Sequence, residues 1–234
     1  MSGKKALARN IEKAASRNTT EHVVNAFKAA LATAPFCGGI ASLITDYIPT
    51  MKQRRIDEFV ERVADDLIAL QDRVDDQALQ TDEFAFIFEK CFRGVAENYQ
   101  AEKLDAFRGI LVNAAIGEDV AGDEQEYFLN LVNTLSALHL RILSFLAAPQ
   151  VYLKARNISP EQISGGFESF FPVAIPGIDI EVIKSAFGDL YQAGLINTDK
   201  SMFTMTTSGR GLDLLGNRVT ELGRRFIIFC TSPA

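Results

Sequence analysis

The stretch IDEFVERVADDLIALQDRV, residues 56–74, decides the fold class of this chain. Its apolar residues recur at spacings of 4, 3, 4, 3 and 4, a heptad pattern about three repeats long. This pattern predicts a helix with one apolar face to bury and a charged, solvated face opposite. The apolar seam could pack inside a helical bundle, which so few repeats favour, or dock against a partner chain. Its members are Ile56, Val60, Val63, Leu67, Leu70 and Val74.

Helical periodicity continues on both sides of this stretch and predicts an antiparallel helical bundle over residues 20–146. Thr81, followed by two acidic residues, is typical of a helix start, and this helix should end near Tyr99. The next helix should stop at Gly117, and residues 123–146 then resume the apolar spacing without interruption.

Length, composition and charge are those of a globular protein with one or two domains. Of the 234 residues, 47% are hydrophobic and 23% are charged, which is enough for a sizeable core. Residues 51–133 carry nine basic and nineteen acidic side chains, whereas residues 134–234 carry nine and eight. The acidic middle argues against a general nucleic-acid coat. We predict a helical bundle over residues 1–133 and a second module over residues 134–234.

No residue pattern in the sequence points to catalysis or to metal binding. Cys37, Cys91 and Cys230 lie far apart in apolar stretches and read as reduced core residues, and no pair has the CxxC spacing. The two histidines, His22 and His139, are too few and too isolated to complete a metal site. No phosphate-binding glycine loop is present either. We therefore predict no enzyme activity, no cofactor, no metal and no small-molecule substrate.

Residues 29–45, AALATAPFCGGIASLIT, carry no charge and follow a cationic amphipathic pattern at residues 4–17. The stretch is shorter than the roughly 20 apolar residues of a membrane span, and Pro35 and the glycine pair predict two short helices joined by a turn. The favoured interpretation is a hairpin buried in the domain. The alternative is a hairpin at residues 29–48 that enters a membrane or binds a partner. Its candidate residues are Phe36, Gly38, Gly39, Ile40, Leu43 and Ile44.

The last third of the chain has a different pattern from the bundle. Proline and glycine punctuate residues 149–177, and a helix is predicted over residues 179–193. Residues 195–198 and 202–207 then alternate like two β-strands joined by the turn at 199–201. A final helical segment follows over residues 218–229. The expected fold is therefore mainly α, with a small α+β module after the bundle.

This order resembles the winged-helix domains of bacterial regulators over residues 134–231. LHLRILSFL would match the first helix, LYQAGLI the end of the recognition helix, and VTELGRRFIIF the segment that closes the wing. The resemblance implies DNA binding, but the helix at 179–193 presents Asp179, Glu181 and Asp189 against the single cation Lys184. Such a helix is poorly equipped to read the major groove. Four arginines near the wing could contact an anion or simply be solvated: Arg210, Arg218, Arg224 and Arg225.

Together these patterns favour a non-enzymatic interaction or regulatory protein that uses the winged-helix-like module and the bundle to bind partner chains, or a second copy of itself. The N-terminal half is similar to uncharacterised bacterial helical proteins, so we expect a bacterial, cytoplasmic protein. One alternative is a membrane-active defence or stress effector acting through residues 1–48, peripheral to the inner membrane. The other is a DNA-binding transcriptional regulator.

Overall fold

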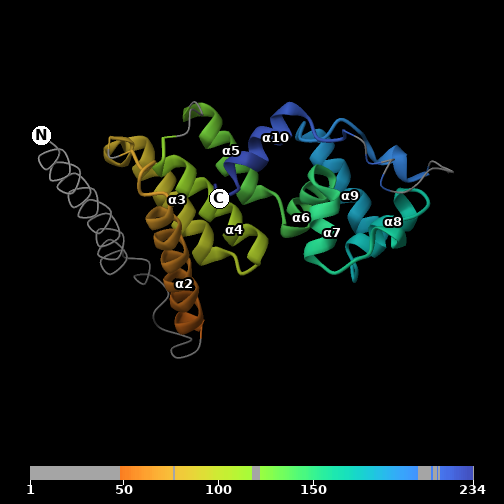
Figure 1. Ribbon diagram of the computed structural model, residues 1–234, viewed down its shortest axis with the longest axis horizontal. Helices are drawn as coiled ribbons and strands as arrows, with labels where there is room; N and C mark the ends of the chain where they lie inside the picture. The colour runs from red at the N-terminus through yellow and green to blue at the C-terminus, as the bar shows by residue number, and fades with distance from the viewer. Residues whose placement is uncertain are drawn as a thin grey trace, which may run out of the picture. The chain divides into compact units, whose positions relative to one another are not determined.

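The computed structural model describes residues 48–75, 77–117, 122–204, 212, 215 and 217–233 (Figure 1). Its described residues form nine α-helices and fall into two compact units. Unit 1 takes in the described residues up to Tyr99, those of Leu104–Leu129 and residues 231–233, and unit 2 takes in Gln100–Lys103 and the described residues of Asn130–Cys230.

The first four helices follow the predicted periodicity closely. They are α2 (Ile48–Ala69), α3 (Asp82–Glu97), α4 (Ala101–Ala115) and α5 (Gly122–Thr134), with a 3-10 turn at Ala78–Gln80. The predicted cap of α3 is confirmed, because the Thr81 hydroxyl accepts a hydrogen bond from the Phe84 N–H at 3.1 Å. Gly117, the predicted stop after α4, has a positive φ of 66°.

The core of unit 1 forms where the heptad face of α2 meets α3. Phe59 of α2 packs edge-to-face on Phe92 of α3, with ring centroids 5.4 Å apart. The ring of Phe107 in α4 lies directly over Gly94 of α3, where an added Cβ would be only 2.2 Å from the ring. Glycine at position 94 therefore allows the ring to touch the backbone of α3.

The apolar pattern of residues 123–146 is divided between two helices. Residues 135 and 136 separate α5 from α6 (Ala137–Ala147), and Ser136 is extended, with φ −78° and ψ 167°. The apolar spacing continues through this break, so periodicity gave no sign of it. A hydrogen bond marks the start of α6 at this break. The Ser136 N–H donates to Nδ1 of His139 at 3.0 Å, which satisfies a backbone donor that has no partner within the helix.

Unit 2 is built around a cluster of phenylalanine rings from four short helical segments. After α6 come α7 (Pro149–Ala155), a 3-10 turn at Pro160–Gln162, α8 (Phe167–Ala174), α9 (Ile180–Gln192), a 3-10 helix at Lys200–Thr204 and α10 (Glu221–Phe229). Neighbouring ring centroids in the cluster lie 5.0 to 6.1 Å apart. The rings are those of Phe145, Phe167, Phe170, Phe171, Phe187 and Phe203.

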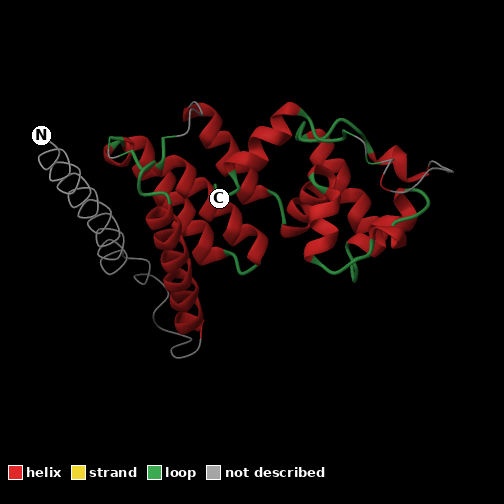
Figure 2. Cartoon of the chain, viewed as in Figure 1, coloured by secondary structure: helices red, strands yellow, loops and turns green. Residues whose placement is uncertain are grey.

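The predicted α+β winged-helix module is contradicted, because the described residues contain helices and loops but no β-strand (Figure 2). Asp199 accepts a hydrogen bond from the Ser201 N–H at 2.7 Å, and a 3-10 helix begins there in place of the second strand. That helix buries Phe203 in the ring cluster. The alternation at 202–204 therefore reflects a core aromatic beside exposed residues, and positions 205–207 lie outside the described residues.

A single antiparallel bridge, between Ile196 and Val219, stands where the first strand was expected. Gly194 ends α9 in the left-handed region with φ 71°, and the Leu195 N–H donates back to the Leu190 carbonyl, so the helix closes as a Schellman motif. Gly223 of α10 packs on this turn, since an added Cβ would be 2.2 Å from the Leu195 carbonyl oxygen.

Candidate functional site

The six candidate hairpin residues, Phe36 to Ile44, lie outside the described residues, as does the cationic pattern at 4–17. The hairpin and its membrane-binding alternative therefore stay predictions. Within the described residues, no single helix is long and apolar enough to cross a membrane, and α5 with α6 reaches that length only as a bent pair.

The heptad seam lies in the core of unit 1. Its first five members, from Ile56 to Leu70, are all buried, and Val74 is half-buried beyond the end of α2. This is the position that the bundle interpretation gives them. Burial leaves those five side chains no apolar surface to offer a partner.

Three of the four candidate anion-binding arginines lie in the described residues, among them Arg218 and Arg224, which donate hydrogen bonds inside the protein. Arg224 bonds Glu221 at 2.9 Å and Asn217 at 2.5 Å, and Arg218 donates to the Thr198 hydroxyl at 3.2 Å. Arg225 is exposed on the same helix as Arg224, and Arg210 lies outside the described residues. Because bonds within the protein occupy Arg218 and Arg224, we do not assign an anion site to them.

A serine, a histidine and an aspartate meet between α6 and α9. The Ser136 hydroxyl lies 2.8 Å from Nδ1 of His139, and Nε2 of His139 lies 3.2 Å from the Asp189 carboxylate. Nδ1 also accepts the Ser136 N–H, so this nitrogen is the acceptor and Nε2 carries the hydrogen that Asp189 receives. The arrangement caps α6 and ties it to α9, while Ser136 and Asp189 are both exposed. It therefore has a complete structural role without catalysis.

Buried and half-buried ionisable groups support the core. Nε of Arg141 donates to the Glu102 carboxylate at 2.6 Å, and although burial opposes it, this contact holds the pKa of Glu102 below its usual value. Burial lowers the pKa of the Lys103 ammonium, which donates to the Asn133 carbonyl at 3.1 Å. Burial also raises the pKa of the Cys91 thiol far above its usual range. Within the described residues, no three potential metal ligands come together.

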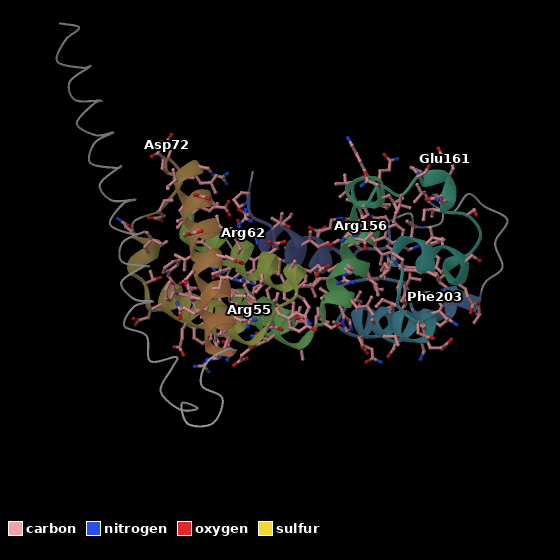
Figure 3. The ribbon with its side chains drawn as sticks, turned by 90° about the horizontal axis from the view of Figure 1, so that it is seen from below. Arg55, Arg62, Asp72, Arg156, Glu161 and Phe203 are labelled. Carbon is pink, nitrogen blue, oxygen red and sulfur yellow. The ribbon has the colours of Figure 1, made fainter. Side chains whose placement is uncertain are left out.

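The outer face of α2 lies opposite the buried heptad seam. It carries acidic residues at spacings of 3 and 4, with one exposed apolar side chain among them, Ile68, which is 52% exposed. Figure 3 shows Arg55 and Arg62 along α2, with Asp72 past the end of the helix. We call this surface the acidic face. It consists of Glu58, Glu61, Asp65, Ile68 and Asp72.

Few contacts inside the chain neutralise the acidic face. Glu58 lies 3.5 Å from Arg54 in a pair that is about two-thirds exposed on both sides, which contributes little. Among the described residues, Glu61 and Asp65 have no ion pair within 4 Å. By contrast, the inner carboxylate Asp66 is held by two hydrogen bonds from Arg108, at 2.6 and 2.8 Å.

The charge order along α2 is opposite to the order that a helix prefers. A helix is stabilised by acidic residues near its N-terminus and basic ones near its C-terminus, by about 0.3–1 kcal/mol each. The first turn of α2 holds no acidic residue and the last turn no basic one, and Lys52 precedes the acidic face while Asp65 lies near the C-terminal end. Glu58, Glu61 and Asp65 lie before the last turn of α2, where the helix dipole has little effect on them.

The sequence contains the acidic spacing of this face, although that spacing by itself predicts only a solvated side of the helix. The 3-and-4 spacing of Glu58, Glu61 and Asp65 repeats that of the buried seam on the opposite side of the helix. The stretches behind the winged-helix resemblance describe packing and turn chemistry and include no reaction signature. Comparison with protein-family models, with curated proteins and with solved structures finds no match to this chain.

Proposed function

We propose that this chain is a non-enzymatic interaction protein whose unit 1 binds a basic segment of a partner protein through the acidic face of α2. The observation that carries the proposal is the contrast between the two sides of one helix. The heptad side is buried, and the opposite side presents exposed carboxylates, of which Glu58 has one weak, exposed ion pair with Arg54. A cationic helix laid along this face would neutralise them.

Charge supports the same class of partner. The described residues of unit 1 carry eight basic and fifteen acidic side chains, so its field attracts cations over a distance of about 10 Å at moderate salt. Such a field speeds association with a basic segment and repels nucleic acid. Ile68 adds an exposed apolar contact to the face, near the C-terminal end of α2.

The proposal can be tested with the full chain and a fluorescent basic amphipathic peptide of unrelated sequence, followed by fluorescence anisotropy. At about 50 mM salt we expect saturable binding that weakens at least tenfold at about 500 mM, because exposed charge pairs are screened. The double substitution Glu61→Lys/Asp65→Lys should weaken binding by roughly tenfold or more, since two attractions become repulsions.

A matched control separates the face from net charge. Glu97→Lys/Glu126→Lys makes the same change in charge at two exposed positions of unit 1 that lie on α3 and α5. It should reduce binding by less than about threefold at the same salt concentration. Equal losses in the two double variants would show that the peptide follows the overall charge, and would overturn the assignment to α2.

A further inference from the structure

We propose that unit 2 carries a binding site for an oxyanion, the phosphate or carboxylate group of a ligand, formed by Tyr152 of α7, Arg156 at the end of α7 and Arg141 of α6. All three residues belong to unit 2. The site is therefore independent of the proposed function, which concerns unit 1 and a ligand of the opposite charge.

The sequence concentrates positive charge in this part of an acidic chain. The whole chain has a net charge of −6, yet residues 127–160 contain no acidic residue and three basic ones, Arg141, Lys154 and Arg156. Helices α6 and α7 lie within this stretch and pack against each other. Glu102, from outside the stretch, pairs with Arg141 at 2.6 Å. Lys154 and Arg156 are exposed, so this surface attracts anions.

The guanidinium of Arg156 is held in one place (Figure 3). Its central carbon lies 3.6 Å from the centroid of the Tyr152 ring, and Nη1 donates one long hydrogen bond, at 3.5 Å, to the Tyr152 carbonyl. The backbone is fixed as well, because α7 ends in a Schellman turn. In this turn Asn157 has a φ of 56°, and the Ile158 N–H donates to the Leu153 carbonyl at 3.0 Å.

This position leaves the binding edge of Arg156 available. Among the described residues, no carboxylate lies within the 4 Å of an ion pair with it. A guanidinium that covers a ring with its face keeps its N–H donors along its edge, where they match two oxygens of a carboxylate or a phosphate. Because the side chain is already ordered on the ring, binding costs it little further freedom.

The hydroxyl of Tyr152 is a second donor beside Arg156, and it has no hydrogen-bond partner in the described part of the chain. Tyr152 is only 5% exposed, and buried tyrosine hydroxyls usually have a partner. The oxygen reaches solvent, since it is not one of the fully enclosed polar atoms. Burial raises the pKa of Tyr152, and the nearby charges of Arg156 and Arg141 oppose this rise. The hydroxyl is therefore protonated near neutral pH and can donate to an anion.

The test is a titration of the full chain with methyl phosphate and, separately, with acetate at constant ionic strength, followed by ¹H–¹⁵N NMR. We expect saturable shifts in α7 with a dissociation constant in roughly the millimolar range, because a single anionic group makes few contacts. Arg156→Gln should weaken binding at least about fivefold, and Tyr152→Phe about threefold, since each removes a donor. Arg156→Lys should also weaken it about threefold, because lysine keeps the charge but lacks the planar fork.

Lys154→Gln is the matched control, because it makes the same change in charge two residues away. It should alter the affinity by less than about twofold. Equal losses in Lys154→Gln and Arg156→Gln would show that the anion follows the general charge, and would overturn the site. Undiminished binding by Tyr152→Phe, or no saturation with either probe, would overturn it too.

The two probes distinguish the sources of the oxyanion. Tighter binding of methyl phosphate would support the site and assign it to a phosphate group, whereas tighter binding of acetate would support it and assign it to a carboxylate. Dispersed amide resonances in the same spectra show that each variant is folded. The Tyr152→Phe variant should retain the urea midpoint of the natural chain, since the hydroxyl has no bond within the described residues to lose.

Discussion

Asp66 is the carboxylate on which three segments of unit 1 meet. Arg108 of α4 donates two hydrogen bonds to it, and the Ser232 hydroxyl donates a third at 2.7 Å. The pair is mostly buried, with side-chain exposures of 23% for Arg108 and 16% for Asp66. We predict that Asp66→Ala lowers the free energy of unfolding by about 2–3 kcal/mol, because it leaves a half-buried guanidinium without its acceptor.

Urea denaturation checks this value. Ser232→Ala removes only one neutral donor from the same carboxylate and should cost about 0.5–1.5 kcal/mol. If the two substitutions cost the same, the Arg108 contact adds nothing beyond an ordinary hydrogen bond, and the prediction is wrong.

Glu102 should make part of the stability of unit 2 depend on acid. Its folded-state pKa is held below the unfolded value of about 4.3, chiefly by Arg141 acting against burial. A depressed carboxylate pKa contributes stability above the unfolded pKa and loses it as pH falls through the folded pKa. We therefore expect the difference in unfolding free energy between the natural chain and Glu102→Gln to be largest near pH 7 and to shrink towards about pH 3. A difference that stays constant over this range would contradict the assignment.

Cys91 should be chemically inert in the folded protein. Its side chain is fully buried, and burial raises the thiol pKa far above its usual range, so almost no thiolate forms near pH 8. Cys230 is only partly buried. In a Cys37→Ser background, we expect Ellman's reagent to react with Cys230 in the native state and with Cys91 only after denaturation. Similar rates for both thiols would show that the interior around Cys91 opens readily.

At the level of elements, the approach of α4 to α3 depends on one missing methyl group. A Cβ at position 94 would lie 2.2 to 2.6 Å from three atoms of the Phe107 ring. We predict that Gly94→Ala destabilises unit 1 by about 1–3 kcal/mol, since the ring or the helix must move. Thermal or urea unfolding measures the loss, and the smaller side chain in Gly94→Ala/Phe107→Leu should recover part of it.

Gly188 provides the control for this effect. It lies inside α9, where an added Cβ would meet only the Lys200 side chain at 3.8 Å. Gly188→Ala should therefore stabilise the protein by roughly 0.5–1 kcal/mol, because alanine is the better helix former. Destabilisation by both substitutions would mean that steric overlap with Phe107 is not the reason for Gly94.

On the scale of the whole molecule, each unit has its own core, and damage to one should stay largely within it. Phe171 is fully buried and contacts five neighbouring rings of the unit 2 cluster. Phe171→Ala should cost about 3–5 kcal/mol. Amide hydrogen exchange should show the larger loss of protection in α8 and α9 and the smaller loss in α2 and α3. Equal losses in both units would show instead that the whole chain opens as one cooperative body.

Local signals explain which parts of the fold were predictable. The helices with a clear apolar stripe and a terminal signal, such as Thr81 before α3 and Gly194 after α9, occur where the pattern places them. The break at Ser136 leaves no mark on the apolar spacing, which continues across it. Over residues 202–204 the predicted strand is wrong, because alternation cannot distinguish a pleated strand from a short helical turn that buries one aromatic residue.

Of the candidate site, the sequence predicts the acidic residues and their spacing but not their surroundings. The sequence contains the acidic spacing of Glu58, Glu61 and Asp65 as plainly as that of the buried seam. It does not reveal which carboxylates are neutralised inside the fold. Asp65 and Asp66 are neighbours of identical chemistry, yet Arg108, 42 positions along the chain, pairs with Asp66 and leaves Asp65 exposed.

The sequence by itself determined a mainly helical chain, the buried side of α2 and the ends of several helices, because these follow from periodicity and from capping groups a few residues apart. Only the tertiary structure decided that Phe203 completes an aromatic core in place of a strand, that Gly94 must be bare for Phe107, and that the carboxylates on the outside of α2 are left exposed. Those outcomes depend on contacts between residues distant in sequence, whose energies no local pattern records.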